Sequence, residues 1–345
     1  MKKEKCFKGF EKGFVYRGKQ YAENTVFEKP KSKTRQSGMH YCKSPFDVLD
    51  YYGLVNSNCE FNEFATVEPL ADEKTADGKN FCTTKLKIGT KLGIPGFVKV
   101  CVDYLNEKTS FSDEEVTDND NGKREAQMVS SGYCAQMALS GYSAKMTSSG
   151  DFAQMASSGD SAQMASSGDF AKMTSSGDYA QMASSGDCAQ MTSSGDYVKM
   201  ASSGDSAQMA SSGDSAKMAS SGDSAQMASS GDSAQMASSG DSAQMASSGD
   251  YAQMASSGDY AKMASSGDYA KMVSTGDYSV LMCAGKNSMA RAKKGSFITL
   301  AEWKYDEEIE KWIPINVKTR KVDGRHIKED TFYKLQDGKF VEAVF

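Results

Sequence analysis

The sequence predicts a mainly β protein built around a β-solenoid of nine-residue repeats. Glycine recurs at every ninth position from Gly132 to Gly285 without a break. The unit reads Gly-Asp-Xaa-Ala-Gln/Lys-Met-Ala/Thr-Ser-Ser, and its fixed small or apolar residues alternate with variable ones, as in a β-strand with one buried face. A fixed period of this kind indicates a repeat architecture in which each unit packs on its neighbours.

Residues 1–115 are expected to form a small α+β domain ahead of the repeats. Residues 13–18 and 97–102 are short runs rich in aromatic and β-branched side chains, which favours strands. Residues 44–52 favour a helix, because Ser44 can cap the first turn and Pro45 suits the first helical position. Residues 116–125, within the polar and acidic run that follows, are the predicted linker.

Residues 126–285 are the predicted solenoid. Positions three to seven of the unit are the expected strand, with the alanine of position four and the methionine of position six pointing inward. Ser-Ser-Gly-Asp is the expected corner, where glycine supplies backbone freedom. Because a nine-residue closed loop leaves little room for a core, we expect two units per coil, about nine coils and a rod of roughly 43 Å.

Two other interpretations of the repeats are weaker. A helical solenoid is disfavoured, because a glycine at every ninth position would interrupt each helix after less than three turns. Disorder is the stronger alternative, since tracts rich in Ser, Gly and Asp often stay unfolded. The methionine register, unbroken between Met128 and Met272, favours a folded array.

Residues 286–345 are expected to form a β cap on the last coil. Residues 296–303 and 311–317 have the pattern of one hairpin. Residues 331–335 and 339–344 flank Asp337 and Gly338, a strong turn signal for a second hairpin. Solenoids need such an end, because the last coil otherwise exposes its core.

Composition and cysteine usage predict a cytoplasmic protein. The first 15 residues are basic but hold no apolar run typical of a signal peptide, and no segment approaches the length of a membrane helix. The eight cysteines are scattered without a CxxC pair. This pattern is typical of free thiols in a reducing compartment.

The sequence contains little that indicates catalysis. Two histidines are present, His40 and His326. His40 and Cys42 form an H-x-C pair that could bind a metal or serve as a thiol and its base. However, a structural metal site usually needs four ligands, and a dyad needs an orienting partner. We interpret the pair as buried structural residues and expect no enzyme activity, metal or cofactor.

The aspartate of position two is the main candidate for function. Residues 126–284 hold 15 aspartates against six lysines, a balance of −9, whereas residues 285–345 carry +3. Two aspartates per coil give about one charge per 2.4 Å of rod, the same order as the one charge per ~1.7 Å of duplex DNA. The candidate partner-binding aspartates are Asp151, Asp160, Asp169, Asp178, Asp187, Asp196, Asp205, Asp214, Asp223, Asp232, Asp241, Asp250, Asp259, Asp268 and Asp277.

Two further interpretations of these aspartates stay open. Each could simply bond corner amides, a structural role that is compatible with an external field. Calcium binding is disfavoured, because one glycine and one aspartate per unit supply too few oxygen ligands.

Aromatic residues at position three are the second candidate surface. With 18 residues per coil, Tyr260 and Tyr278 are predicted on one face, and Tyr251 and Tyr269 on the other. Phe152 and Phe170 are expected to stack similarly near the first coils. Such ladders stabilise sheets by themselves. Exposed, they would also suit a protein partner or self-association into a homo-oligomer.

The segment Ser37-Gly38-Met39-His40-Tyr41-Cys42-Lys43-Ser44-Pro45-Phe46-Asp47-Val48-Leu49-Asp50-Tyr51-Tyr52 resembles a known pattern. The pattern, GFHAC-x-x-P-x-DVL-x-YY, belongs to an uncharacterised bacterial and phage or prophage family that continues with nonapeptides such as SGDYAQAAT. The chain departs from it at Met39, Tyr41 and the repeat methionine, which implies a differently filled core. The resemblance implies a phage or mobile-element origin.

These observations lead to three hypotheses of function. The first is a non-enzymatic, phage-type interaction protein whose acidic solenoid mimics nucleic acid and inhibits a host nucleic-acid-binding defence protein. Such a protein would contact neither nucleic acid itself nor a membrane. The second is a structural spacer or assembly protein whose rod separates two end domains. The third is an enzyme in the N-terminal domain that uses His40 and Cys42.

Overall fold

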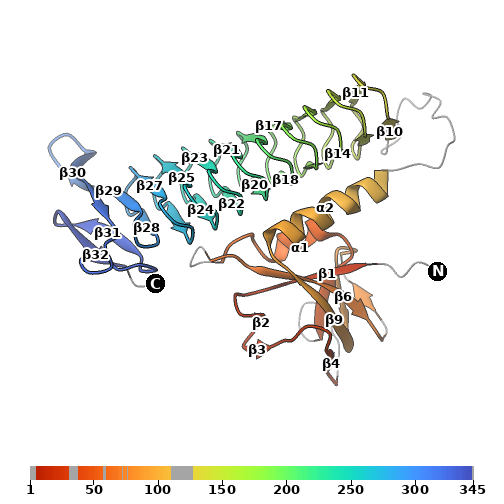
Figure 1. Cartoon of the computed structure of the whole chain (residues 1–345), viewed down its shortest axis with the longest axis horizontal. Coiled ribbons are helices and arrows are strands. Elements are labelled where there is room, and N and C mark those ends of the chain that lie inside the picture. Colours follow the sequence, from red (N-terminus) through yellow and green to blue (C-terminus); the bar gives the residue numbers. More distant parts are fainter. Residues whose placement is uncertain are drawn as a thin grey trace.

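The computed structural model is a straight rod with a small domain lying along its flank (Figure 1). It describes residues 5–30, 38–56, 60–71, 73–75, 77–109 and 127–343. The predicted linker, 116–125, lies outside the described residues. The fold class is confirmed: the chain is mainly β, with a solenoid of about ten stacked turns and a small N-terminal domain.

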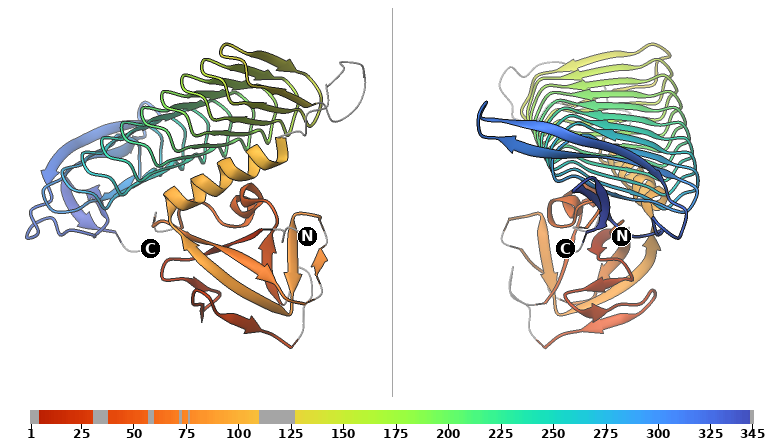
Figure 2. Two further views of the ribbon diagram at one scale, coloured as in Figure 1. Left: turned by 45° about the vertical axis from the view of Figure 1, so that its right-hand side comes forward. Right: turned by 90° about the vertical axis from the view of Figure 1, so that its left-hand side faces the viewer.

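The N-terminal domain is an antiparallel sheet with two helices on the side that faces the rod (Figures 1 and 2). Its strand order is β4-β9-β6-β1-β5-β8-β7, and β2 and β3 form a separate ribbon. The elements are β1 (Cys6–Phe10), β2 (Val15–Tyr16), β3 (Lys19–Gln20), β4 (Val26–Glu28), β5 (Met39–Cys42), α1 (Pro45–Tyr51), β6 (Glu63–Pro69), β7 (Lys74–Thr75), β8 (Asn80–Thr83), β9 (Lys85–Leu92) and α2 (Ile94–Thr109).

The helix predicted after Ser44 is confirmed as α1. The Ser44 side chain accepts a hydrogen bond from the Phe46 amide at 3.2 Å, and Pro45 occupies the first turn. This is the N-cap geometry that satisfies an otherwise unpaired helical amide.

The strand predicted at residues 97–102 is wrong, because this segment lies inside α2. Ile94, Phe97, Val98 and Cys101 are all buried, and their spacing places them on one face of a helix. The β-branched content of the run suggested a strand, but burying this stripe against the rod stabilises a helix. The other predicted run, 13–18, contains only the two-residue strand β2.

The solenoid coils hold two units each, as predicted. Each strand pairs in parallel with the strand two units later, so Met146 lies beside Met164, 18 residues on. One sheet contains β10 (Gln127–Ser130), β12 (Lys145–Ser148), β14 (Gln163–Ser166), β16 (Gln181–Ser184), β18 (Lys199–Ser202), β20 (Lys217–Ser220), β22 (Gln235–Ser238), β24 (Gln253–Ser256), β26 (Lys271–Ser274) and β28 (Met289–Arg291). The facing sheet contains β11 (Gln136–Leu139), β13 (Gln154–Ser157), β15 (Lys172–Ser175), β17 (Gln190–Ser193), β19 (Gln208–Ser211), β21 (Gln226–Ser229), β23 (Gln244–Ser247), β25 (Lys262–Ser265) and β27 (Val280–Cys283).

The strand occupies positions five to eight of the unit, not three to seven as predicted. Position three adopts a left-handed conformation, with φ between 55° and 59° from Phe152 to Tyr278, and this ends the extended backbone. The predicted inward alanine and methionine are confirmed as the core, which is buried from Met146 to Met272. The serine of position eight shares their parity and is buried too.

The repeat glycine serves close stacking of the coils. The prediction that it supplies backbone freedom is wrong, because the repeat glycines do not have positive φ. Instead, a Cβ built on Gly213 would overlap the carbonyl oxygen of Gly195 in the preceding coil. The same overlap recurs along the array, so glycine is needed wherever one corner stacks directly on another.

Both predicted hairpins are confirmed at the C-terminal end. They are formed by β29 (Phe297–Asp306) with β30 (Lys311–Lys321), and by β31 (Tyr333–Gln336) with β32 (Lys339–Glu342). Asp337 and Gly338 have φ of 50° and 65°, as a two-residue type I′ turn requires. Val322, Ile327 and Leu335 belong to the same buried cluster as the methionines, so this segment closes the end of the core.

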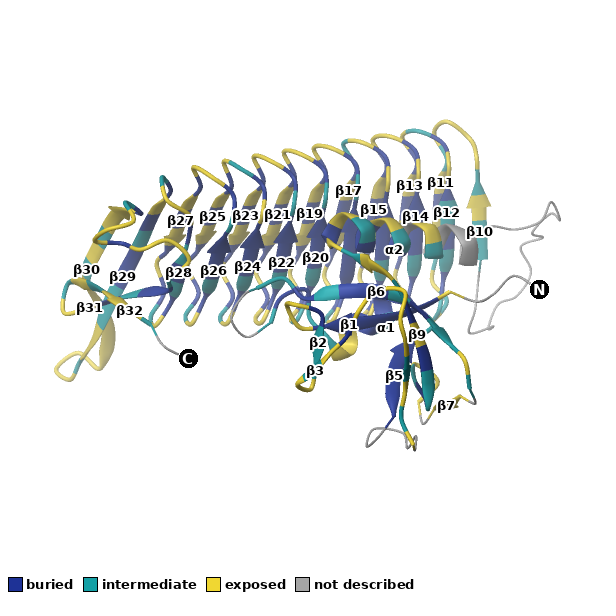
Figure 3. Ribbon diagram, turned by 60° about the horizontal axis from the view of Figure 1, so that its bottom comes forward, coloured by how far each residue is buried: buried dark blue, intermediate teal, exposed yellow. Residues whose placement is uncertain are grey.

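The N-terminal domain docks on one face of the rod. Lys199 Nζ lies 2.6 Å from Asp50 Oδ1 and donates to the Phe46 carbonyl at 3.0 Å, and Lys217 donates to the Leu49 carbonyl. We call this face, the β10–β28 sheet, the covered sheet (Figure 3). The residues that share the domain's buried cluster are Ala165, Ala183, Ala201, Ala219 and Ala237.

The facing sheet, β11–β27, is the open sheet. Its strands alternate exposed and buried residues, whereas the third residue of most covered strands is buried. The two sheets have nearly identical sequences, so the difference arises from what packs on the covered sheet and not from the repeats themselves. The N-terminal domain packs on the alanines from Ala165 to Ala237, and Phe332 of the cap packs on Val273.

The stacking role of glycine can be tested with Gly213→Ala. An alanine at an unstrained φ normally stabilises a protein slightly by restricting the unfolded chain. Here the methyl group would push two coils apart, and we expect the free energy of unfolding to fall by about 3 kcal/mol. Urea denaturation followed by circular dichroism measures the change. The matched control is the exposed neighbour Ser212→Ala, which should change stability little; equal stability of both variants would contradict the stacking role.

Candidate functional site

The aspartates of position two form two ladders on opposite edges of the rod, because consecutive units end at opposite corners of each coil. The first ladder precedes the open-sheet strands and the second precedes the covered-sheet strands. The first ladder is Asp151, Asp169, Asp187, Asp205, Asp223, Asp241, Asp259 and Asp277. The second ladder is Asp160, Asp178, Asp196, Asp214, Asp232, Asp250 and Asp268.

Each ladder is held by hydrogen bonds between coils. The Asp241 amide donates to Asp223 Oδ1 at 2.8 Å, and bonds of 2.7–3.0 Å repeat this contact along both ladders. Backbone hydrogen bonds also join the corners of successive coils; for example, the Ser206 amide donates to the Asp223 carbonyl at 2.8 Å. The interpretation that these aspartates bond corner amides is therefore confirmed, with the difference that the amide belongs to the next coil.

The ladders keep most of their charge exposed. Their aspartates are exposed or half-buried, and among the described residues Asp268 is the one member in an ion pair, 2.8 Å from Lys286 Nζ. Lys286 stands where the second ladder would continue, and its amide still donates to Asp268 Oδ1. The expected charge spacing needs refinement: each edge carries one carboxylate per coil, about 4.8 Å apart.

The aromatic residues of position three stack beside the ladders, on the predicted faces. Ring centroids are 5.7 Å apart for Tyr260 and Tyr278, and 5.0 Å apart for Tyr251 and Tyr269. The first pair follows first-ladder aspartates and the second pair follows second-ladder aspartates. Each of these rings is about half exposed, so each edge presents stacked rings next to carboxylates.

A further stacked pair was not among the predicted candidates. The rings of Tyr179 and Tyr197 lie 5.2 Å apart beside the second ladder. The 18-residue spacing, which identified the other pairs, also applies here and could have found them. Phe152 and Phe170, predicted to stack near the first coils, do so at 4.9 Å beside the first ladder.

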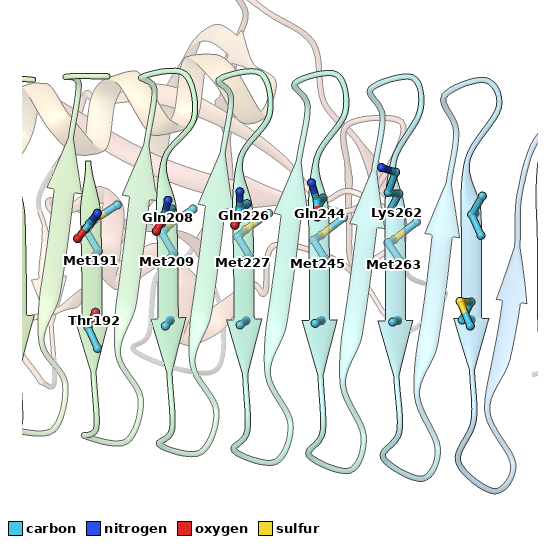
Figure 4. A pocket seen from close by; sticks show the side chains of 17 residues that line it. Met191, Thr192, Gln208, Met209, Gln226, Met227, Gln244, Met245, Lys262 and Met263 are labelled. Carbon is cyan, nitrogen blue, oxygen red and sulfur yellow. The ribbon is translucent and has the colours of Figure 1, made fainter. Parts of the chain in front are cut away.

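The open sheet carries a shallow groove of about 710 Å³ that the sequence did not reveal (Figure 4). Long side chains of position five form one wall, and the small residues of position seven form its floor. Residues in these two columns include Gln190, Gln208, Gln226, Gln244, Lys262, Thr192, Ala210, Ala228, Ala246 and Ala264. Because every unit has these residue types, repetition alone cannot indicate which half of the coil stays uncovered.

His40 and Cys42 lie in β5 and are both buried. Burial lowers the pKa of His40, and positive charges of Lys8, Arg17 and Lys29 lower it further. Burial raises the pKa of the Cys42 thiol, with a smaller contribution from Asp47. Both shifts favour the uncharged forms, and this opposes an activated thiolate–imidazolium pair.

The other histidine and the remaining ligand types form no metal cluster. His326 is an exposed residue of the cap, with Nδ1 2.8 Å from Asp323 Oδ2. Within the described ranges, no group of three or more His, Cys, Asp and Glu side chains could hold a metal ion. None of the described cysteines, which exclude Cys59, takes part in a disulfide bond.

Comparison with known families gives one match. Residues 4–100 match the model of a domain of unknown function, DUF7666. The match covers the N-terminal sheet, α1 and the first part of α2, and it leaves the solenoid and the cap outside. No curated protein and no solved structure matches the chain. None of the helices in the described residues is long and apolar enough to cross a membrane.

The two roles of the ladder can be separated with Asp223→Ala and Asp223→Asn. Alanine removes the acceptor for the Asp241 amide, so we expect the free energy of unfolding to fall by about 1 kcal/mol. Asparagine keeps an acceptor oxygen and removes one of a row of like charges, so stability should stay within about 0.5 kcal/mol of the original. Urea denaturation at low salt measures both. An equal loss in the two variants would contradict the hydrogen-bond role.

Proposed function

We propose that the chain is a non-enzymatic interaction protein whose ladders imitate the phosphate rows of nucleic acid and that it inhibits a nucleic-acid-binding protein. The observation that carries the proposal is the pair of continuous, exposed carboxylate rows along the rod. In the phage setting implied by the sequence resemblance, the target would be a host defence protein.

The fixed positions of the ladder carboxylates support this function. Each carboxylate from Asp151 to Asp268 accepts a hydrogen bond from an amide of the next coil, so these charges are held in place before a partner arrives. Binding then costs less conformational entropy than it would if the acidic side chains of the rod were flexible. Rows of like charge also steer a basic partner toward the rod, and this raises the association rate at low salt.

The charge density suits a strongly salt-dependent interaction. Counting both edges, the rod has about one carboxylate per 2.4 Å of its length. This is a lower charge density than that of duplex DNA, which has one charge per ~1.7 Å. A groove lined by lysine and arginine would contact one edge at a time, since the two ladders lie on opposite edges. We therefore propose that one ladder and its neighbouring tyrosines form a single binding surface.

The spacer hypothesis has less support from the arrangement of the domains. A spacer would hold one domain at each end of the rod. The N-terminal domain instead lies along the covered sheet, where Arg291 near the cap also contacts Glu60 at 3.2 Å. The N-terminal domain and the C-terminal segment thus contact each other on the same face of the rod, instead of being held apart by it.

Charge-neutral ladder variants test the proposed function. Asn would replace Asp187, Asp223 and Asp259 in the first ladder, or Asp178, Asp214 and Asp250 in the second. The full chain would capture proteins from bacterial lysate at low salt, with elution by duplex DNA. If the proposal holds, the captured protein binds nucleic acid, DNA displaces it, and one of the variants weakens binding about tenfold, with an unchanged melting curve.

The matched control removes charge of the opposite sign. Lys172→Gln combined with Lys262→Gln takes two exposed lysines from the open sheet and should preserve or strengthen capture. The proposal fails if both ladder variants bind the captured protein as the original chain does, or if duplex DNA does not displace it.

A further inference from the structure

The N-terminal domain contains a cavity of about 840 Å³ that is separate from the solenoid edges. It lies among β1, β2, β5, the end of α1 and the segment that follows, and its lining is rich in aromatic and amide side chains. Its volume lies within the range of small-molecule sites in proteins. The residues that matter for its chemistry are Lys8, Tyr16, Arg17, His40, Tyr52 and Asn62.

Lys8 is the unusual residue of this cavity. It sits in the middle of β1 with an exposed fraction of 1%, and among the described residues no carboxylate pairs with it. Its Nζ lies 3.8 Å from the centroid of the Tyr16 ring and donates to the Tyr52 hydroxyl at 3.3 Å. Gly9 makes room for this arrangement, because a Cβ there would overlap the Tyr52 ring.

The charges around Lys8 are mainly positive. Burial is the largest cause that lowers the pKa of Lys8 to about 7; Cys42 opposes this shift, and the nearby charges of Lys29 and Arg17 lower the pKa further. Glu11 is the one acidic residue in the cavity lining, and it is exposed. A buried ammonium with positive neighbours is costly unless an anion compensates it.

Residues that line the cavity also have polar atoms without partners. His40 Nε2, Asn62 Oδ1 and Asn80 Oδ1 are buried and have no hydrogen-bond partner, although Asn62 Nδ2 donates to the Gly53 carbonyl at 2.9 Å. Buried polar groups are nearly always paired in folded proteins. Three unpaired atoms in residues that line one cavity, beside a lysine without a carboxylate partner, are the pattern of a binding site prepared for a polar ligand.

We infer that this cavity binds a small organic anion that carries a flat ring. The ammonium of Lys8 pairs with the anionic group, and Arg17 adds to the attraction. The ring packs against Tyr16 and Tyr52, and the unpaired atoms of His40 and Asn62 bond its polar substituents. This site uses none of the ladder residues, so a test of the site is independent of a test of the proposed mimicry.

Calorimetric titration of the full chain at pH 6.5 tests the inference. The probes are benzoate and adenosine 5′-monophosphate, and benzyl alcohol and adenosine serve as their neutral counterparts. We expect at least one anion to bind with a stoichiometry of one and about tenfold more tightly than its neutral counterpart. The inference is overturned if neither anion binds below about 10 mM, or if the neutral compounds bind equally well.

Two variants assign the binding to this cavity. Lys8→Met keeps a long apolar side chain and should weaken binding about tenfold, whereas Lys87→Met, on the exposed side of β9, should leave it unchanged. Arg17→Gln changes an exposed residue, so it reports on the same site even if Lys8→Met fails to fold. Unchanged affinity in the Arg17 variant and in a folded Lys8 variant would place the ligand elsewhere and refute the site.

Affinity should fall between pH 6.5 and pH 8.5. The pKa of Lys8 is lowered to about 7, so its ammonium form is present below that pH and is lost above it. His40, Cys42 and Tyr52 should not change charge in this window, because burial lowers the pKa of the first and raises the pKa of the other two. Calorimetry at both pH values measures the fall. An affinity independent of pH would exclude Lys8 as the anion partner.

Discussion

The close stacking of the corner glycines is the constraint on which the rest of the rod depends. With no Cβ, Gly213 can place its backbone directly against the carbonyl of Gly195, and the same contact is repeated coil after coil. This fixes both the spacing and the 18-residue register. Only in this register do methionines pack on methionines, do aromatic rings stack, and does an aspartate oxygen reach the amide of the next coil. The acidic edges are thus a consequence of the same contact that builds the core.

The hydrogen bonds of the ladder do not by themselves require a negative charge. Asparagine would accept the bond from the next amide without repelling its neighbours about 4.8 Å away. A carboxylate makes a stronger, charge-assisted bond, and this offsets part of the repulsion. Position three varies among Ser, Tyr, Phe and Cys, yet position two is aspartate in all units from Asp151 to Asp277. The repeated charge therefore fits a function that uses the field of the rod, in addition to its structural bond.

Much of the architecture followed from residue patterns, and the failures have physical causes. Two-residue alternation identified the inward alanine and methionine, and the turn signal at Asp337 and Gly338 identified a hairpin. The strand limits were misplaced because non-glycine residues such as Phe152 adopt left-handed φ at position three, where the stacking of successive corners overrides the local preference. The helix α2 was missed because its apolar residues line one face only to pack against the covered sheet, and the sequence of the segment does not show that partner. The cavity around Lys8 could not be predicted, since a lysine within a strand ordinarily points to solvent.

The charge pattern changes sign at the cap, and this gives the rod one distinct end. The second ladder stops where Lys286 takes the place of an aspartate and pairs with Asp268. Beyond it, residues 285–345 carry a balance of +3, against −9 for residues 126–284. A basic groove that lies along the rod would be attracted by the coils and repelled by the cap, so its position along the ladders would be set by the cap. Duplex DNA has no such end. If the chain acts as the proposed mimic, this boundary would let it occupy a binding groove in one register instead of sliding along it.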